Sequence, residues 1–345
     1  MIKKKTIKVI GGIIAAIVLI ALLYTVIWAV DQNLGVFSWD DDYEEEEEEY
    51  ISLNGQDYVL GHKVKAYLVL GTDGSGNEDA AGEEYQGSMA DFLLLAVVDD
   101  ENKTYGFLQL NRDTMTKITL LQKDGTGYAS AEMQLCTAHW YGKNKKASCK
   151  NTVEAVSGLL GGIPIDGYYA LPMEQIPALN HAVGGVTVTL QDDFTSVDPT
   201  MEKGATLTLN DEQAYAYVRG RMGIGDGENT SRMARQKEYM KAFFAKVMEQ
   251  NVKDKEFVIK LYEQLQNVST SDVNMKYISK LTENIGTYKN VGLLVPEGEV
   301  KLGEALDDGK EHTEFYIDEA SLEECAKMLF PLEAVEVEDC EETEE

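Results

Sequence analysis

The sequence predicts an α/β domain in which helices cover both faces of a central mixed β-sheet, giving three layers. Short apolar runs of strand length alternate along the chain with stretches in which apolar residues recur at helical spacing. No repeat or low-complexity break interrupts residues 58–332, so we expect this range to form one domain. A single longer apolar run precedes it near the N-terminus.

The expected strands and helices follow one another along this domain. Strands are predicted at 65–70, 91–98, 104–110 and 185–190, where apolar and β-branched residues are bounded by turn-forming residues. Helices are predicted at 151–160, 172–183, 210–218, 232–250, 254–266, 272–284 and 319–330. Asn210 is followed three positions later by Gln213, which predicts a capping box at the start of the third helix.

Residues 9–30 predict a transmembrane anchor. These 22 residues carry no charge, and as a helix they would extend about 33 Å, enough to cross the core of a bilayer. Four lysines precede the run within residues 1–8, and acids follow it from Asp31. The positive flank is expected to stay inside the cell, which leaves the domain outside the cytoplasm. A cleaved signal peptide is the alternative.

Two acidic segments are predicted to flank the domain. Residues 40–49 hold nine Asp and Glu and residues 333–345 hold eight more, within a formal net charge of −29. Dense runs of like charge repel one another and usually remain solvated, so we expect a linker at 31–57 and a tail at 333–345. Lys and Arg are too sparse elsewhere to form a face that attracts a polyanion, which excludes nucleic acid as a partner.

The four cysteines suit an extracytoplasmic domain. Cys136 and Cys149 lie 13 positions apart, and Cys325 and Cys340 lie 15 apart. Neither spacing is typical of a zinc site. An even number of cysteines outside the cytoplasm favours two disulfides. Free buried thiols are the alternative.

The arginines identify the candidate binding site. Of 31 basic residues only five are arginine, and four of these fall within residues 219–235. Arginine presents a planar group with several donors that grips phosphate or carboxylate oxygens, which lysine cannot do. The five are Arg112, Arg219, Arg221, Arg232 and Arg235.

The spacing of these residues supports one shared ligand. Arg232, Arg235 and Gln236 are related as i, i+3 and i+4, so they share a helix face. They also fall in its first turns, where backbone N–H groups and the helix dipole favour an anion. The Gly-rich loop at 220–231 would bring them towards Arg219 and Arg221 around a phosphate-bearing ligand.

Three aspartates supply a candidate metal site. Asp73, Asp91 and Asp113 each lie at the boundary of a predicted strand, and ligands collect at strand ends in α/β sheets. Two aspartates that face a diphosphate are the usual way to hold Mg²⁺. The histidines His139 and His181 are expected to be structural.

Six segments, taken in order, resemble the LytR-CpsA-Psr phosphotransferases of Gram-positive cell envelopes. They are YLVLGTD at 67–73, ADFLLLAVV at 90–98, LNRDTM at 110–115, HAVGGVTV at 181–188, LNDEQAYAYVRGR at 209–221 and SRMARQ at 231–236. The resemblance implies transfer of a glycosyl phosphate from a polyprenyl-pyrophosphate-linked glycan to peptidoglycan. The glycan, whether teichoic acid, capsule or another polymer, stays open. The polyprenyl chain needs an apolar groove, which we expect between the sheet and the helices after Asn151.

The resemblance also implies roles for single residues. Asp73 and Asp91 are similar to the Mg²⁺-binding aspartates of the family. The diphosphate clamp would consist of Arg112, Arg219, Arg221, Arg232 and Gln236, with Arg235 as the adjacent motif arginine. The proton of the acceptor hydroxyl would pass to an aspartate, either Asp113 or Asp226.

Three positions depart from the family's pattern. Met89 stands where many members have Arg, Asn229 where many have Asp, and Asn111 where Pro is frequent. Asp226, in the same loop as Asn229, is a candidate replacement for the missing carboxylate. These departures keep two alternatives open. One is a non-catalytic scaffold or sensor that binds polyprenyl pyrophosphate, and the other is a pyrophosphatase in which water replaces the sugar hydroxyl.

Overall fold

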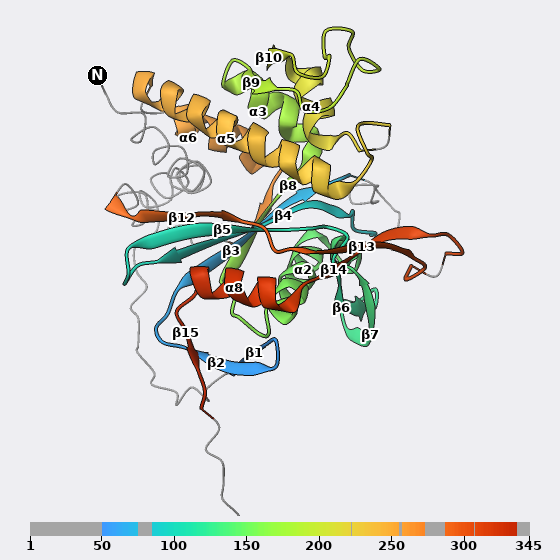
Figure 1. Ribbon diagram of the computed structural model, residues 1–345, viewed down its shortest axis with the longest axis vertical. Helices are drawn as coiled ribbons and strands as arrows, with labels where there is room; N and C mark the ends of the chain where they lie inside the picture. Colours follow the sequence, from blue (N-terminus) through green and yellow to red (C-terminus); the bar gives the residue numbers. More distant parts are fainter. Residues whose placement is uncertain are drawn as a thin grey trace, which may run out of the picture.

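A six-stranded mixed sheet forms the middle layer of the domain in the computed structural model (Figure 1), which describes residues 50–74, 85–221, 223–254, 257–272, 287–306 and 308–336. Across the sheet the strands are β11 (Thr270–Ser271), β8 (Gly167–Pro172), β3 (Lys65–Thr72), β4 (Ala90–Asp99), β5 (Thr104–Leu110) and β12 (Lys289–Leu294). The pairs β3–β4 and β4–β5 are antiparallel, whereas β3–β8 and β5–β12 are parallel. The predicted mixed sheet is therefore confirmed.

Helices cover both faces of this sheet (Figure 1). One face carries α3 (Ile176–Ala182), α4 (Asp211–Arg219), α5 (Asn229–Lys253) and α6 (Phe257–Gln266), and the other carries α2 (Lys145–Leu159) and α8 (Glu319–Leu329). The sequence of β4 is almost continuously apolar because the strand is buried on both faces. Leu94 packs into the core on the α5 face, while Leu93 and Leu95 pack into the core on the α2 face.

The remaining elements form smaller sheets and turns around these layers. They are β6 (Met115–Leu121), β7 (Gly127–Gln134), β9 (Val186–Thr189), β10 (Thr206–Leu209), β13 (Gly298–Gly303), β14 (His312–Ile317) and the 3₁₀ turns η1 (Leu135–Trp140) and η2 (Met173–Gln175). The hairpin β13–β14 lies beside β6 and β7 (Figure 1), and a bridge joins Thr114 to Phe315.

Local sequence signals set the boundaries of the helices that carry the site. The capping box that starts α4 is confirmed: Asn210 Oδ1 accepts from the Gln213 backbone N–H at 2.9 Å, and Gln213 Oε1 accepts from the Asn210 N–H at 3.0 Å. Helix α5 begins at Asn229, three residues before the predicted start, so Arg232 is its fourth residue. The predicted helix at 172–183 begins later, because β8 continues to Pro172.

The domain extends further at both ends than the acidic composition predicted. A three-stranded sheet joins β1 (Ile51–Leu53), β2 (Gln56–Leu60) and β15 (Leu332–Ala334). Its alternating side chains Ile51, Leu53 and Tyr58 are buried. Residues 50–57 and 333–334 are thus parts of the fold rather than linker and tail, because apolar burial there outweighs the acidic surroundings.

Several predictions fall outside the described residues. They are the anchor at 9–30, the acidic run at 40–49, residues 273–284 of a predicted helix, Cys340 and the acids from Glu338 onward. Within the described ranges, no helix has the combination of length and hydropathy that crossing a membrane requires.

Candidate functional site

The site is built around the carboxylate of Asp91, at the start of β4. Arg112 donates through Nη1 to Asp91 Oδ1, and Arg232 Nη1 lies 3.3 Å from Asp91 Oδ2. Arg112 follows β5, which pairs with β4, and Arg232 reaches the same sheet edge from the first turn of α5. Residues that are 141 positions apart in sequence, Asp91 and Arg232, thus share one buried ion pair.

Asp113 extends this pair into an alternating row of charges. Its Oδ1 lies 3.2 Å from Arg112 Nε, and its Oδ2 lies 3.3 Å from Arg221 Nη2. Arg221 is held in turn by Gly227 O, which accepts from Nε at 3.2 Å, and by Thr313 Oγ1 at 3.0 Å from Nη2. We call the row formed by Arg232, Asp91, Arg112, Asp113 and Arg221 the charged cluster.

The charged cluster holds three guanidinium groups against two carboxylates, and it is poorly exposed. Burial lowers the pKa of Arg232 to about 10, and repulsion from Arg112 and Arg221 adds to this effect. The attraction of Asp91 opposes it but is outweighed. Burial also disfavours the charge of Arg112, but Cys136 and the carboxylates of Asp91 and Asp113 outweigh it and raise the pKa of Arg112. An added anion would relieve the repulsion that Arg232 experiences, so the cluster favours a phosphate-bearing ligand.

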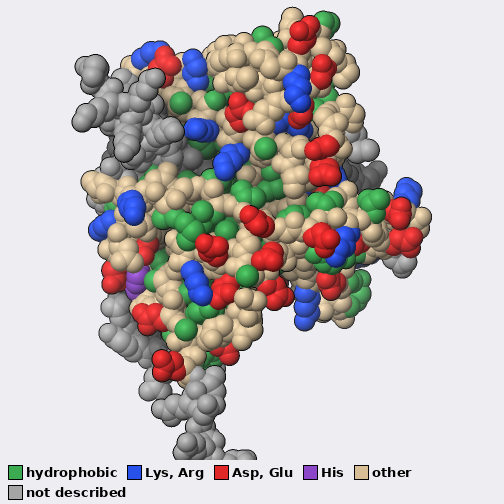
Figure 2. Space-filling model, viewed as in Figure 1, with side chains coloured by type: hydrophobic (Ala, Val, Ile, Leu, Met, Phe, Trp, Pro, Cys, Tyr) green, Lys and Arg blue, Asp and Glu red, His purple; other side chains and the backbone are tan. Residues whose placement is uncertain are grey.

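The basic residues of the charged cluster are poorly exposed, unlike those on the visible surface. On the face shown in Figure 2, Lys and Arg side chains lie scattered among Asp and Glu. In the charged cluster, by contrast, the side chain of Arg232 is only 3% exposed and that of Arg112 is 13% exposed. Low solvent exposure strengthens the attraction of these groups for an anion.

Arg219 lies next to the charged cluster and donates a hydrogen bond to the backbone of Asp73. Its Nη2 donates to Asp73 O at 3.0 Å, while Nη1 donates to the Tyr215 hydroxyl and lies 3.3 Å from Glu174 Oε1. It is more exposed than the other four arginines, with 34% of its side-chain surface accessible. In this structure Arg219 therefore supports the loop that carries Asp73.

Gln236, expected in the diphosphate clamp, and Arg235, the adjacent motif arginine, both point away from the charged cluster. Arg235 is buried, and its Nη1 lies 2.6 Å from Asp192 Oδ2 while its other nitrogens donate to Tyr217 O and Gly220 O. Gln236 bonds to Val218 O and accepts from the amide of Gln109. The i, i+3, i+4 spacing predicted a common face correctly, but α5 buries that face beyond Arg232 against α4 and the sheet.

The hydrogen bonds of Asp226 are likewise made outside the charged cluster. Its Oδ1 accepts from the Glu228 N–H at 2.9 Å, and its Oδ2 accepts from Ser231 Oγ at 2.6 Å. These bonds lower the pKa of Asp226, with that from Ser231 contributing most. The carboxylate thus orders the turn that leads into α5.

Two of the three departures from the family pattern, Asn229 and Met89, contact arginines of the charged cluster, and Asn111 bonds to Asn229. Asn229 accepts from Arg232 Nη2 and donates through Nδ2 to Asn111 Oδ1 at 2.6 Å. The third, Met89, places its sulfur 3.0 Å from Arg112 Nη2. These residues are therefore neighbours of the guanidinium groups and not scattered variation.

The cysteines differ from the disulfide prediction. Cys136 is a buried free thiol that is not bonded to Cys149, and Cys325 is also free. The Cys136 sulfur instead lies 2.8 Å from Arg112 Nη2, and the Cys149 sulfur lies 3.6 Å from His139 Nε2. Burial raises the pKa of Cys136 to about 11. No sequence signal pointed to Cys136 as a neighbour of Arg112, because only the turn from β7 into η1 brings them together.

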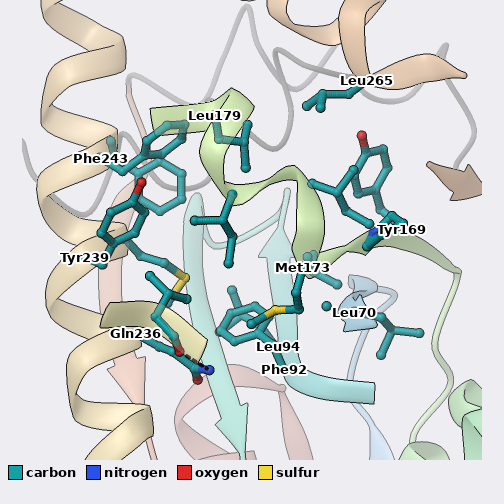
Figure 3. Close-up of a pocket in the computed structure, with 18 residues that line it drawn as sticks. Leu70, Phe92, Leu94, Tyr169, Met173, Leu179, Gln236, Tyr239, Phe243 and Leu265 are labelled. Carbon is teal, nitrogen blue, oxygen red and sulfur yellow. Dashed lines mark hydrogen bonds between the residues drawn. The ribbon is translucent and has the colours of Figure 1, made fainter. Parts of the chain in front are cut away.

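An apolar cavity of about 160 Å³ opens between the sheet and α3, α5 and α6. Figure 3 shows Phe92 and Leu94 rising from β4, Leu179 from α3, and Tyr239 and Phe243 from α5. This confirms the expected position of an apolar groove beyond Asn151. Gln236 lines this cavity one helical turn after Arg232 on α5, so the cavity adjoins the charged cluster.

The aspartates expected to hold a metal come from paired strands. Asp73 follows β3 and Asp91 begins β4, and Asp73 Oδ1 accepts from the Met89 N–H at 3.0 Å. Among the described residues, no group of three or more His, Cys, Asp or Glu is arranged to hold a metal ion. Two carboxylates with phosphate oxygens and water fit Mg²⁺, which seldom uses an all-protein cage.

Comparison with known proteins supports the assignment of the fold. The model of the LytR_cpsA_psr family matches residues 32–327 of the chain. Among solved structures, protein gbs0355 from Streptococcus agalactiae aligns with a TM-score of 0.60 at 22% identity, covering 77% of this chain and 88% of that chain. At this identity the likeness shows a shared fold.

Two curated relatives align over part of their length. Biofilm regulatory protein A of Streptococcus mutans is 29% identical over 213 residues, covering 58% of this chain and 48% of that protein. The polyisoprenyl-teichoic acid--peptidoglycan teichoic acid transferase TagV of Bacillus subtilis is 30% identical over 195 residues, covering 55% of this chain and 46% of that protein. The chain thus spans about half the length of the curated relatives it matches.

Proposed function

The chain belongs to the LytR_cpsA_psr family, and from this premise we propose that it is a glycopolymer phosphotransferase. It would move a glycosyl phosphate from a polyprenyl-pyrophosphate carrier to a peptidoglycan hydroxyl. One relative is named as a teichoic acid transferase acting on peptidoglycan, which supports this substrate class. The run at 9–30 would anchor the protein in the cell membrane, with the domain outside the cytoplasm.

The observation that carries the proposal is that the charged cluster and the apolar cavity lie next to each other. Arg232 belongs to the charged cluster, and Gln236, one helical turn later on the same face of α5, lines the apolar cavity. A ligand that fills both must combine phosphate groups with a hydrocarbon chain. A polyprenyl pyrophosphate has this combination, whereas a nucleotide or a free sugar phosphate lacks the hydrocarbon part.

The residues of the charged cluster would have separate roles in the transfer reaction. Arg112 and Arg232 would exchange part of their contact with Asp91 for the diphosphate oxygens, and Arg221 would bind from the side of Asp113. Their preorganised donors would stabilise the charge that develops on the departing lipid phosphate. Asp73 and Asp91 would hold Mg²⁺, which would supply further charge neutralisation at the phosphate oxygens.

A binding-only function is the alternative that a specific observation favours. Met89 places a sulfur against Arg112 at a position where many family members have a further arginine. One fewer guanidinium group weakens transition-state stabilisation more than it weakens ligand capture. A scaffold or sensor that holds polyprenyl pyrophosphate without cleaving it would result.

The experiment that decides between these functions uses the full chain in detergent solution. A polyprenyl-pyrophosphate glycan and peptidoglycan fragments are added with Mg²⁺ or with EDTA, and products are followed by mass spectrometry. We expect Mg²⁺-dependent polyprenyl phosphate together with a phosphodiester-linked glycan. Polyprenyl phosphate without the adduct would indicate a pyrophosphatase, and binding of an intact substrate would indicate the scaffold.

A further inference from the structure

A second cavity, of about 350 Å³, adjoins the charged cluster. Arg112, Asp113 and Arg221 line one side of it. Leu306, between β13 and β14, and Thr313, in β14, line the other side. This cavity is more polar than the apolar cavity, and it shares no lining residue with it.

Buried polar atoms in this second cavity lack hydrogen-bond partners. Gln134 donates through Nε2 to Thr313 O at 3.3 Å, which fixes the orientation of its amide. Within the described part of the chain, Gln134 Oε1 has no hydrogen-bond partner, and neither does Asp113 Oδ2. The latter contacts Arg221 only as an ion pair at 3.3 Å. Two buried acceptors in one cavity favour a ligand that brings hydroxyl donors.

The two cavities lie on opposite faces of β4. Phe92 and Leu94 line the apolar cavity, while Leu93 and Leu95 pack in the core on the other face of β4. The second cavity is on that other face, because Leu306 lines it and packs against the same core as Leu93. The charged cluster therefore separates an apolar cavity from a polar one.

This arrangement matches the geometry of phosphoryl transfer, in which the attacking and leaving oxygens lie on opposite sides of phosphorus. A lipid phosphate that departs on the apolar side requires a nucleophile from the polar side. We propose that the second cavity is the acceptor site, and that it binds a sugar of peptidoglycan with Asp113 as the general base and Gln134 as a specificity-determining residue.

The inference rests on the proposed function and completes its chemistry. The acceptor hydroxyl oxygen forms a bond to the glycan-linked phosphorus, and its proton passes to Asp113 Oδ2. The bond from that phosphorus to the bridging oxygen breaks, and polyprenyl phosphate leaves with the electron pair. Gln134 Oε1 accepts from a second hydroxyl of the same sugar and so orients it.

Two tryptophan substitutions on one segment provide the test. Leu306→Trp fills the second cavity, whereas Leu302→Trp changes a residue of β13 that is 67% exposed and does not line it. For the full chain in detergent solution, we expect Leu306→Trp to raise KM for a soluble peptidoglycan fragment about tenfold or more. Binding of the polyprenyl-pyrophosphate glycan should stay within about twofold of the unmodified protein. Leu302→Trp should change neither quantity.

A smaller substitution and a second measurement keep the test decisive. Gln134→Leu removes the acceptor oxygen without filling the cavity, and we expect it to raise KM for the fragment roughly tenfold with little change in kcat. Direct binding of the fragment, measured by calorimetry without the lipid substrate, should weaken in the Leu306→Trp protein. If folded Leu306→Trp protein binds the fragment as tightly as the Leu302→Trp protein, the acceptor site is wrong. If the unmodified protein binds the fragment but never cleaves the lipid, the proposed transferase function fails while this site stands.

Discussion

The side-chain amide of Asn229 donates to Asn111 Oδ1 at 2.6 Å, while its carbonyl oxygen accepts from Arg232. Asn111 Oδ1 also accepts from the Asp113 N–H at 3.0 Å, so its amide cannot rotate without loss of that bond. The two asparagines, 118 positions apart, thus form one hydrogen-bonded unit next to the charged cluster. They are also two of the three positions that depart from the family pattern, so these departures are coupled in space.

This coupling predicts the behaviour of Asn229→Asp. The substitution would place a carboxylate oxygen against Asn111 Oδ1, where two acceptors face each other. In the Asn111→Ala background that conflict is absent, so Asn229→Asp should be more favourable there by about 1 kcal/mol or more. Urea denaturation of the four proteins of the cycle measures the difference. Lys117→Ala, at an exposed position of β6, should combine additively with Asn229→Asp, and an additive result for the asparagine pair would contradict the coupling.

Arg112 should affect activity more than stability, because without it Asp91 keeps its ion pair with Arg232 and Asp113 keeps its ion pair with Arg221. Its guanidinium contacts Asp91 and Asp113 at the centre of the charged cluster. Removal of one such donor commonly lowers kcat by a factor of about 100 or more, so we expect Arg112→Ala to abolish turnover. Arg112→Lys keeps the charge but loses the planar pair of donors, and it should recover only part of the rate. Transfer activity at a rate like that of Lys117→Ala would show that Arg112 has another role.

Arg235 should show the opposite behaviour. Its side chain is 1% exposed and paired with Asp192, and it also holds the backbone carbonyls of Tyr217 and Gly220. Loss of one partner of a buried ion pair costs about 3–5 kcal/mol. Arg235→Ala should therefore lower the free energy of unfolding by this amount in urea denaturation. A stable Arg235→Ala protein with weakened binding of pyrophosphate would show instead that Arg235 belongs to the diphosphate clamp.

The thiol of Cys136 should be unreactive in the folded protein. Burial raises its pKa to about 11 from an ordinary value of 9.0, so the neutral thiol persists at neutral pH. Because the folded state then binds the proton more tightly than the unfolded state, this group stabilises the fold less as the pH rises from 9 to 11. Iodoacetamide at pH 7 should modify Cys136 only after denaturation, without any reductant. A peptide joined through Cys136 and Cys149, found by mass spectrometry, would contradict the free thiols.

The sequence by itself determined the layers of the fold, and it predicted the chemical class of the ligand. The apolar run of β4 and the capping box at Asn210 are local signals, and the structure has both as predicted. The concentration of arginine near α5 predicted a phosphate-bearing ligand because only that side chain offers several donors in one plane. Arg112, Arg221 and Arg232 do meet around Asp91 and Asp113.

Only the tertiary structure decided which of the candidates meet. Arg232 and Arg235 share a helix face, yet the packing of α5 against α4 buries Arg235 with Asp192 and leaves Arg232 at Asp91. In the same way, Cys136 lies against Arg112 rather than against Cys149, although the chain spacing allowed either arrangement. The polar and apolar cavities lie against the two cores that the sheet separates, and these cores exist only once helices cover both faces of the sheet. Spacing along a chain fixes which residues share an element, but the packing between elements fixes which of them touch.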